Sequence, residues 1–342
     1  MATTFAVPDG RVAMNAVLRN GFGTSGGSVT SLNFQPDFLW EKARNLGYNH
    51  QLVDSVRGVS KVLNSNLTDA ENTQTTYVIS FNSNGYTLGA NDYGTSVTLV
   101  DWCWKAGGTA VSNTAGTITS SVSANTTAGF SVVTFTGNGV DTLSGVATVG
   151  HGLGVTPSFI ITKKRSSGTD YNWSTYHISN GNANVWLNTT GGKNSNNWVT
   201  APAATVFTPP VSLYGNESGV NYVAYCWAPV AGYSAFGSYT GNGSADGPFI
   251  YTGFRPRWLM IKRTDSTQNW IIVDTSKDTY NVANKRLFAN LSDAEDTGIP
   301  NYMDMVSNGF KCRDSNVSYN ASGGTYIYAA FAENPLKYSN AR

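Results

Sequence analysis

The sequence predicts an all-β protein of three tandem antiparallel β-sandwich domains, of the jelly-roll or lectin-like type, with short helices in their loops. Two observations carry this prediction: the composition of the chain and an internal repeat. Of the 342 residues, 12% are aromatic and 36 are Gly, while only 13% are charged. Aromatic and β-branched residues favour strands, and Gly and Asn favour turns. This composition is therefore typical of a β-rich chain with many turns.

The internal repeat occurs three times. A Pro, an aromatic residue two positions later, an apolar run and a Lys recur as FQPDFLWEK at 34–42, VTPSFIITK at 155–163 and FRPRWLMIK at 254–262. An aromatic strand closes each copy, as LVDWCW at 99–104, YVAYCW at 222–227 and YIYAAF at 326–331. Solenoid repeats have periods of ~20–50 residues. These copies are farther apart, so each is expected to be a domain.

The repeat also sets the expected elements in chain order. Residues 34–108 form the first β-sandwich unit, and residues 109–128, rich in Gly, Ser and Thr, form a linker. Residues 129–231 and 232–342 form the second and third units. Each of these begins with a strand that ends in a Thr-Gly-Asn-Gly turn. The phrases NLTDAE at 66–71 and NLSDAE at 290–295 resemble capping boxes, so a short helix is expected after each.

Charge and cysteine content exclude several classes of function. Lys and Arg number 22 and Asp and Glu 21, so the net charge of +1 offers no basis for binding nucleic acid. No run approaches the ~18 apolar residues of a membrane span, and no secretory signal is visible. Three Cys are too few for a disulfide framework. Cys103 and Cys226 lie in equivalent apolar runs, where Ala330 stands in the third copy, and are expected to be buried thiols.

Paired acids are the first catalytic candidates, because glycosidases use two carboxylates. Asp54 with Glu71 and Asp274 with Glu295 stand at matching places in the first and third copies. In the second copy His177 stands where Asp54 and Asp274 stand, and the Asp-Ala-Glu phrase is absent. A position that takes Asp or His is more simply a hydrogen-bonding residue at a strand end. We therefore predict no catalytic residue and no enzyme.

Metal and cofactor sites are not expected either. The acidic clusters at 69–71 and 293–296 could offer oxygen ligands to Ca²⁺, but neither follows a calcium-loop pattern, and acids in a helical first turn complement the helix dipole. The three histidines, His50, His151 and His177, form no metal-binding or nucleophilic motif. Basic residues recur after each apolar run, at 42–44, 163–165 and 262–263. Their stems are expected to cover apolar surface, and their heads to reach water or the acids of a neighbouring unit.

Aromatic residues outside regular strands are candidates for binding sugars, because flat rings stack on pyranose faces. Trp186, Trp198 and Tyr214 lie in Asn-, Gly- and Thr-rich stretches of the middle copy. Neighbouring Asn, Thr and Tyr side chains could supply hydrogen bonds to a glycan. These three residues form the predicted glycan-binding site, with packing in the core as the alternative for each of them.

Longer phrases point to a known family. They are LVDSVRG at 52–58, NLTDAE at 66–71, WCWKAGG at 102–108, TVGHGLG at 148–154 and YTGNGSADG at 239–247. In these phrases, and over residues 34–342, the chain resembles a family of marine bacteriophage virion and tail-fibre-like proteins of unknown function with concanavalin-like lectin-type repeats. Residues 1–33 do not match that resemblance and are expected to form an N-terminal attachment segment.

The resemblance implies a bacteriophage virion structural protein, a tail fibre or receptor-binding appendage that contacts host-surface glycans. It implies a protein made in the host cytoplasm and localised to the virion, with other virion proteins as partners and a homotrimer as its assembly. It supplies no catalytic residue. A capsid decoration protein and a polysaccharide-degrading tailspike are the alternatives within the virion, and a free carbohydrate-binding module is the alternative outside it.

Overall fold

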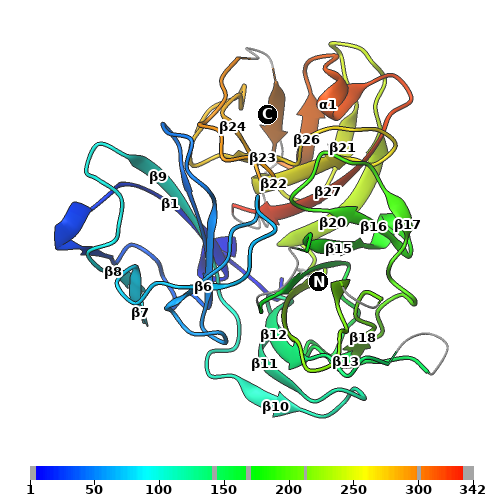
Figure 1. Ribbon diagram of the computed structural model, residues 1–342. Coiled ribbons are helices and arrows are strands. Elements are labelled where there is room, and N and C mark those ends of the chain that lie inside the picture. Colours follow the sequence, from blue (N-terminus) through cyan, green and yellow to red (C-terminus); the bar gives the residue numbers. More distant parts are fainter. Residues whose placement is uncertain (1–4, 141–144, 167–170, 212–213, 299–301, 334–342) are drawn as a thin grey trace.

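The structure is a computed structural model that describes residues 5–140, 145–166, 171–211, 214–298 and 302–333. Strands account for 41% of the residues and helices for 4%, which confirms the predicted all-β class. The strands fall into three consecutive groups, which we call the first unit (β1 to β9), the second unit (β10 to β19) and the third unit (β20 to β27). Figure 1 shows these units, coloured blue to cyan, green, and yellow to red, around a common centre.

Each unit contains one large antiparallel sheet, and the four central strands follow one order in all three. The first unit has the order β1 (Met14–Asn20), β9 (Thr98–Trp104), β3 (Phe38–Ala43) and β4 (Gln51–Asp54). The second has β10 (Val111–Asn113), β11 (Ser120–Asn125), β12 (Phe130–Thr136), β19 (Asn221–Trp227), β14 (Phe159–Lys164), β15 (Ser174–His177), β16 (Ala183–Trp186) and β17 (Asn194–Asn196). The third has β20 (Ser234–Thr240), β27 (Thr325–Ala332), β22 (Pro256–Arg263), β23 (Ile271–Asp274) and β24 (Arg286–Phe288).

A smaller sheet faces each large one. Strands β2 (Gly27–Val29), β8 (Gly85–Leu88) and β7 (Val78–Asn82) form it in the first unit, and β21 (Phe249–Tyr251), β26 (Gly309–Cys312) and β25 (Met303–Val306) in the third. Among its described residues, the second unit has β13 (Val149–Gly150) and β18 (Val206–Phe207) here. A separate apolar cluster fills the space between the two sheets of each unit.

Cys103 and Cys226 each lie in the apolar cluster of their own unit, opposite Leu39 and Ile160 in the strand register. The third unit has Ala330 at this position, opposite Leu259. Both thiols are free and buried, so the expectation of two equivalent buried thiols is confirmed.

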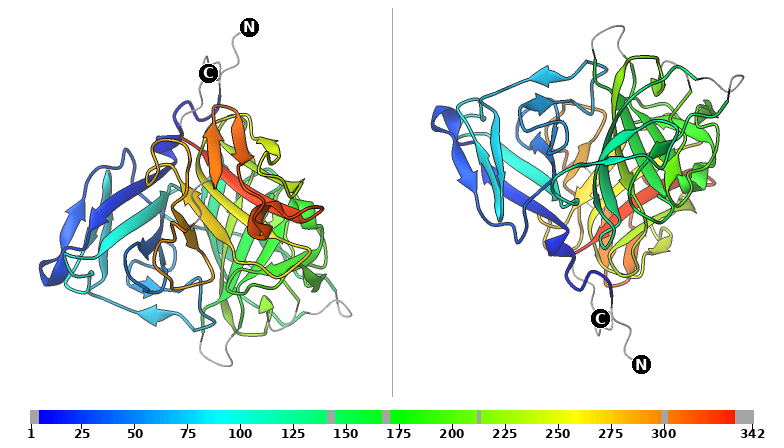
Figure 2. Two further views of the ribbon diagram at one scale, coloured as in Figure 1. Left: turned by 90° about the horizontal axis from the view of Figure 1, so that it is seen from above. Right: turned by 90° about the horizontal axis from the view of Figure 1, so that it is seen from below.

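The other faces of the three large sheets pack against one another in a single shared core. Seven of the nine tryptophans belong to this core. Ring contacts cross every boundary between units: Phe38 stacks on Tyr225 with centroids 4.3 Å apart, Trp104 meets Trp258 at 5.5 Å, and Phe159 meets Phe236 at 6.1 Å. Large aromatic side chains bury much apolar area each. The units are therefore packed as one body rather than strung out along the chain (Figures 1 and 2).

Two predicted boundaries are wrong. Met14–Asn20, within the expected attachment segment, pairs along its whole length with β9 in the first unit. Ser120–Asn125, within the expected linker, pairs with β12 and widens the sheet of the second unit. Both segments contribute to the sheets because their alternate residues, such as Met14 and Val122, face apolar clusters. The first and last described segments lie side by side, since Gly10 approaches the backbone of Ala332 (Figure 2).

The expected helices after the two Asp-Ala-Glu phrases are also absent from the described residues, which show no regular helix at 66–75 and 290–298. The short helices lie elsewhere, at η1 (Gly10–Val12), η2 (Gly23–Ser25), η3 (Ile178–Asn180) and α1 (Val317–Asn320). A short strand pair, β5 (Lys61–Val62) with β6 (Asn72–Thr73), flanks the first phrase. Neither phrase forms a regular helix or strand, and both bond to a neighbouring unit, as described below.

Candidate functional site

Asp54, His177 and Asp274 occupy one equivalent position, the end of the fourth strand, opposite Phe38, Phe159 and Trp258. All three are buried, and each reaches into a neighbouring unit. Asp54 Oδ2 accepts a hydrogen bond from the Tyr225 hydroxyl at 2.8 Å, and Asp274 Oδ2 accepts one from Trp102 Nε1 at 2.6 Å. The His177 Nε2 atom lies 3.0 Å from the Tyr328 carbonyl oxygen. The first unit thus contacts the second, the second the third, and the third the first.

The residue type at this position depends on the group that it hydrogen-bonds in the neighbouring unit. Trp102, Tyr225 and Ala329 are equivalent, because each lies two residues before the aromatic residue that pairs with Phe38, Phe159 or Trp258. A carboxylate can only accept a hydrogen bond, so Asp suits an indole or phenol donor. Where Ala329 offers no donor, an imidazole N–H donates to the backbone carbonyl instead. This explains the Asp/His alternation and supports the predicted strand-end role.

A second ring of hydrogen bonds runs in the opposite sense. His50, Trp173 and Trp270 precede the fourth strand of their units, and each ring nitrogen bonds a backbone carbonyl of another unit. Trp173 Nε1 donates to Asn64 O and Trp270 Nε1 to Trp186 O, both at 2.9 Å, and His50 Nε2 lies 2.9 Å from Phe288 O. Burial lowers the pKa of His50 to about 3 and that of His177 to about 4, which keeps both imidazoles neutral.

The acids of the two candidate catalytic pairs form ion pairs with basic residues. Arg57 lies between Asp54 and Glu71, and it pairs with both of them. Glu71 also pairs with Arg165 of the second unit at 2.9 Å, and its backbone N–H donates to Arg165 O at 2.9 Å. These bonds join the first Asp-Ala-Glu phrase to the second unit.

The other acid pair is held in the same way. Glu295 pairs with Arg44 of the first unit at 2.9 Å, and its N–H donates to Arg44 O at 2.6 Å. The expectation that the recurring basic heads meet acids of a neighbouring unit is confirmed for Arg44 and Arg165. Neither Glu71 nor Glu295 is left as an acid available to a substrate.

Two of the three predicted glycan-binding residues come together on the second unit. The rings of Trp186 and Tyr214, both partly exposed, lie with centroids 4.7 Å apart. Tyr171, which the sequence did not single out, extends the group with its ring 6.0 Å from Tyr214. Lys164 Nζ stands 4.4 Å above the Tyr171 ring and 2.7 Å from Glu217. We call Tyr171, Trp186 and Tyr214 the aromatic cluster of the second unit.

Trp198 does not belong to this cluster. Its side chain is fully buried in the apolar cluster between the sheets of the second unit, 5.6 Å from the Tyr176 ring and 6.4 Å from Phe207. Its Nε1 atom lies 3.3 Å from Asn184 Oδ1. A ring enclosed on both faces has none left for a sugar, so the assignment of Trp198 to a glycan site is wrong. Sequence context alone could not separate the two tryptophans, because both lie in Asn-rich stretches.

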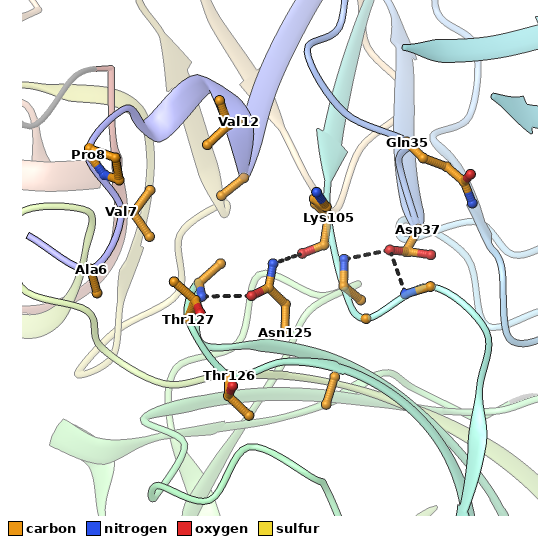
Figure 3. Close-up of a pocket in the computed structure, with 16 residues that line it drawn as sticks. Ala6, Val7, Pro8, Val12, Gln35, Asp37, Lys105, Asn125, Thr126 and Thr127 are labelled. Atoms are coloured by element: carbon orange, nitrogen blue, oxygen red, sulfur yellow. Dashed lines mark hydrogen bonds between the residues drawn. The ribbon is translucent and has the colours of Figure 1, made fainter. Parts of the chain in front are cut away.

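A cleft lies where the first unit connects to the second (Figure 3). It measures about 630 Å³ and is lined by the N-terminal segment, the residues around Asp37 and Lys105, and the turn between β11 and β12. Asp37 Oδ2 accepts hydrogen bonds from the N–H groups of Ala106 at 2.8 Å and Gly108 at 3.3 Å. Burial raises the pKa of Asp37. Asn125 binds backbone groups of the same crossing. The side chains of Asp37 and Asn125 are thus hydrogen-bonded to the backbone of the segment that connects the first unit to the second.

The first unit also contains a buried charge cluster. Arg19 pairs with Asp101 at 2.5 Å, with Asp92 at 2.8 Å and with Glu41, and all four side chains are nearly inaccessible. Burial, together with the nearby Asp101 and Asp92 carboxylates, raises the pKa of Glu41 to about 8.

The corresponding positions of the other units hold uncharged residues. Phe135, Thr162 and Ala224 stand there in the second unit, and Tyr239, Ile261 and Tyr328 in the third. The fold therefore does not require the charges. A cleft beside Arg19 is lined by Leu18, Arg19, Asn20, Arg44 and Thr98 and by none of the three acids.

Among the residues that the structure describes, no three His, Cys, Asp or Glu side chains gather as a metal-binding group. No helix in the described ranges is long and apolar enough to cross a membrane.

Comparison with known proteins identifies a family but no biochemical activity. A family model described as a domain of unknown function, DUF7483, matches residues 11–335. No curated protein and no solved structure matches the chain.

Proposed function

The chain belongs to the DUF7483 family, and we propose that it is a non-enzymatic structural protein of a bacteriophage virion, a tail fibre or receptor-binding appendage that contacts host-surface glycans. One observation carries the structural part of this proposal: the closed ring of inter-unit bonds made by Asp54, His177 and Asp274. It joins three units around one aromatic core without any disulfide among the described residues. Such a rigid body suits a part that is exposed on a particle.

We further propose that each unit is a lectin-like β-sandwich domain. The common order of the four central strands and the facing smaller sheets support this. Sandwich scaffolds present variable loops on a constant frame. The second unit departs from the other two in carrying the additional strands β10, β11 and β17 in its large sheet, together with the aromatic cluster of Tyr171, Trp186 and Tyr214.

The aromatic cluster of the second unit is the proposed glycan contact. Its rings offer apolar faces, and the Lys164–Glu217 pair beside them offers charged hydrogen-bonding groups. Pockets for small ligands combine apolar surface with a few polar groups in this way. Trp186 is not needed for the fold, because the equivalent residues of the other units are Asn64 and Phe288, and the inter-unit bond at this position uses only the backbone carbonyl.

The test is the adsorption of phage particles that carry Trp186→Asn together with Tyr214→Ala. We expect weaker adsorption to host cells with an unchanged melting temperature. Particles carrying Tyr280→Ala, which removes a ring that is 85% exposed on the third unit, serve as the control and should adsorb normally. Unchanged adsorption of the double variant would exclude this cluster as the contact.

Assembly into a homotrimer and attachment to other virion proteins are part of the same proposal. Several copies on one particle would convert weak single contacts into avid ones, by ~10²–10⁴ when geometry permits. Light scattering of the purified chain tests the trimer. Labelling of virions with an antibody tests the position: tail labelling supports the proposal, and capsid labelling supports a decoration protein instead. Hydrolysis of host polysaccharide by the pure chain would support a tailspike.

A further inference from the structure

The outer face of the small sheet in the third unit displays two aromatic rings. Phe249 is 47% exposed and Tyr251 is 67% exposed, while Ile250 between them is 6% exposed and belongs to the core of the unit. Successive side chains of a strand point to opposite faces. The two rings therefore stand next to each other on the solvent side of β21.

The first unit shows that the fold does not require these rings. Strand β2 pairs with β8 as β21 pairs with β26, so that Ser28 opposite Thr87 corresponds to Phe249 opposite Lys311. By the same register Thr30 corresponds to Tyr251. In the first unit this face is a network of hydroxyl and amide groups, in which Ser28 Oγ and Asn82 Nδ2 each lie 2.9 Å from Thr87 Oγ1. The third unit thus carries aromatic rings where the first carries a polar surface.

The rings are held close to the sheet. Gly309 lies opposite Tyr251, and a Cβ added there would come within 2.9 Å of Phe249 Cε2. The Phe249 ring therefore covers the glycine. A Cβ added to Gly253, whose φ is +85°, would lie 3.6 Å from the Tyr251 hydroxyl. The Phe249 ring therefore lies against the neighbouring strand, and the Tyr251 hydroxyl lies within van der Waals reach of Gly253.

Charged groups border this surface. Lys311, which pairs with Phe249 across the strands, contacts Asp246 at 2.8 Å, and Asp304, which pairs with Lys311, contacts Arg313 at 3.3 Å. The Asp246 side chain is 85% exposed. A ligand lying on the rings would meet donors and acceptors at their edge.

We propose that Phe249 and Tyr251 form a second carbohydrate-binding surface, which takes pyranose rings of a polysaccharide through stacking, with Lys311 and Asp246 bonding to their hydroxyl groups. The choice of ligand rests on the proposed function. A pyranose has an apolar C–H face and a polar rim, which matches rings bordered by ion pairs. A protein partner fits less well, since stable protein interfaces bury about 800 Å² on each side with few charges at their centre, and this surface offers two rings among charges.

The test uses the full-length chain in affinity electrophoresis through gels that contain dextran, laminarin, a soluble galactan or hydroxyethyl chitin. The variant is Phe249→Ser with Tyr251→Thr, the residues that the first unit carries at these positions, so folding is expected to be retained and is checked by thermal melting. We expect at least one polysaccharide to retard the wild type. The variant should bind about tenfold more weakly, because two ring contacts are lost.

Two controls separate this inference from the proposed function. The variant Trp186→Asn with Tyr214→Ala leaves the third unit intact, and Tyr280→Ala removes an unrelated exposed ring. If only the Trp186/Tyr214 variant loses retardation, the second surface is refuted and the proposed glycan contact stands. If only the Phe249/Tyr251 variant loses it, the second surface stands and the first contact fails. No retardation of the wild type by any of the four polysaccharides, or a loss of self-association in the Phe249/Tyr251 variant alone, would overturn the carbohydrate assignment.

Discussion

The carboxylate of Asp54 accepts a hydrogen bond from the Tyr225 hydroxyl at 2.8 Å, although 171 positions separate the two residues. Asp274 and Trp102 repeat this relationship at 2.6 Å, and His177 with the Tyr328 carbonyl repeats it with donor and acceptor exchanged. Each bond joins a strand end of one unit to the central strand of the next. The three bonds close a ring, so the loss of any one of them is expected to weaken the packing of the whole chain.

Removing the Tyr225 hydroxyl tests the value of one of these bonds. Tyr225→Phe should lower the free energy of unfolding by about 1–2 kcal/mol, because the buried Asp54 loses a donor and Arg57, which donates to the same hydroxyl at 3.1 Å, loses an acceptor. Tyr233→Phe is the matched control, since Tyr233 lies in the same core and its buried hydroxyl has no partner among the described residues. Urea denaturation of both variants measures the difference. Equal stabilities would show that the Asp54 bond contributes nothing.

His177→Asp installs the residue that the other two units carry at this position. We expect a loss of about 2–4 kcal/mol, because the new carboxylate would be buried against the Tyr328 carbonyl, and two acceptors cannot bond each other. His177→Gln keeps an N–H donor and should lose less. A fully stable Asp variant, judged by denaturant titration, would show that the residue type is not tied to its partner.

Acid should destabilise the protein before most carboxylates titrate. Burial lowers the pKa of His50 to about 3 and that of His177 to about 4, and it also lowers the pKa of His151. Below about pH 6.5 the unfolded chain binds protons at these residues that the folded chain does not bind, so stability falls as the pH falls. The slope should approach ~1.4 kcal/mol per pH unit for each histidine. Denaturation between pH 6.5 and 5 measures it, and a constant stability there would contradict buried neutral imidazoles.

The contribution of Glu41 to stability should fall as the pH rises toward 8. Burial raises the pKa of this carboxyl to about 8 in the folded chain. The unfolded chain releases the proton near its ordinary pKa of about 4.5, so the stabilisation is complete below that value and is lost as the pH rises through 8. The contribution of Glu41 to stability should therefore decline up to about pH 8. It is measured as the difference between the wild type and Glu41→Gln from pH 6.5 to 9, because burial lowers the pKa of Lys42 to about 8 and that of Lys262 to about 7, which changes total stability in the opposite direction. Glu41→Gln carries no titrating proton and should remove the decline, as the neutral Thr162 and Ile261 at the equivalent positions suggest. An unchanged decline in the variant would place the titration elsewhere.

The repeat in the sequence located the central strands well, because each carries its own local signal. A Pro, an aromatic residue and an apolar run mark β3, β14 and β22, and the equivalence of Cys103 with Cys226 follows from the same alignment. Strand β1 has no such signal, since Met14 and Arg19 replace the aromatic Phe130 and Phe135 of its counterpart β12. It belongs to the sheet because it pairs with β9, which no local pattern records.

The way in which the three units meet depends on contacts that no local sequence pattern contains. The sequence could show that Asp54, His177 and Asp274 hold one position, but their partners lie on other units, and residues far apart in the chain become neighbours only when the sheets pack. The same packing buried Trp198 and left Trp186 partly exposed beside Tyr214, although both tryptophans have similar sequence surroundings. Local propensity sets the strands, whereas burial and hydrogen-bond partners depend on contacts between distant segments.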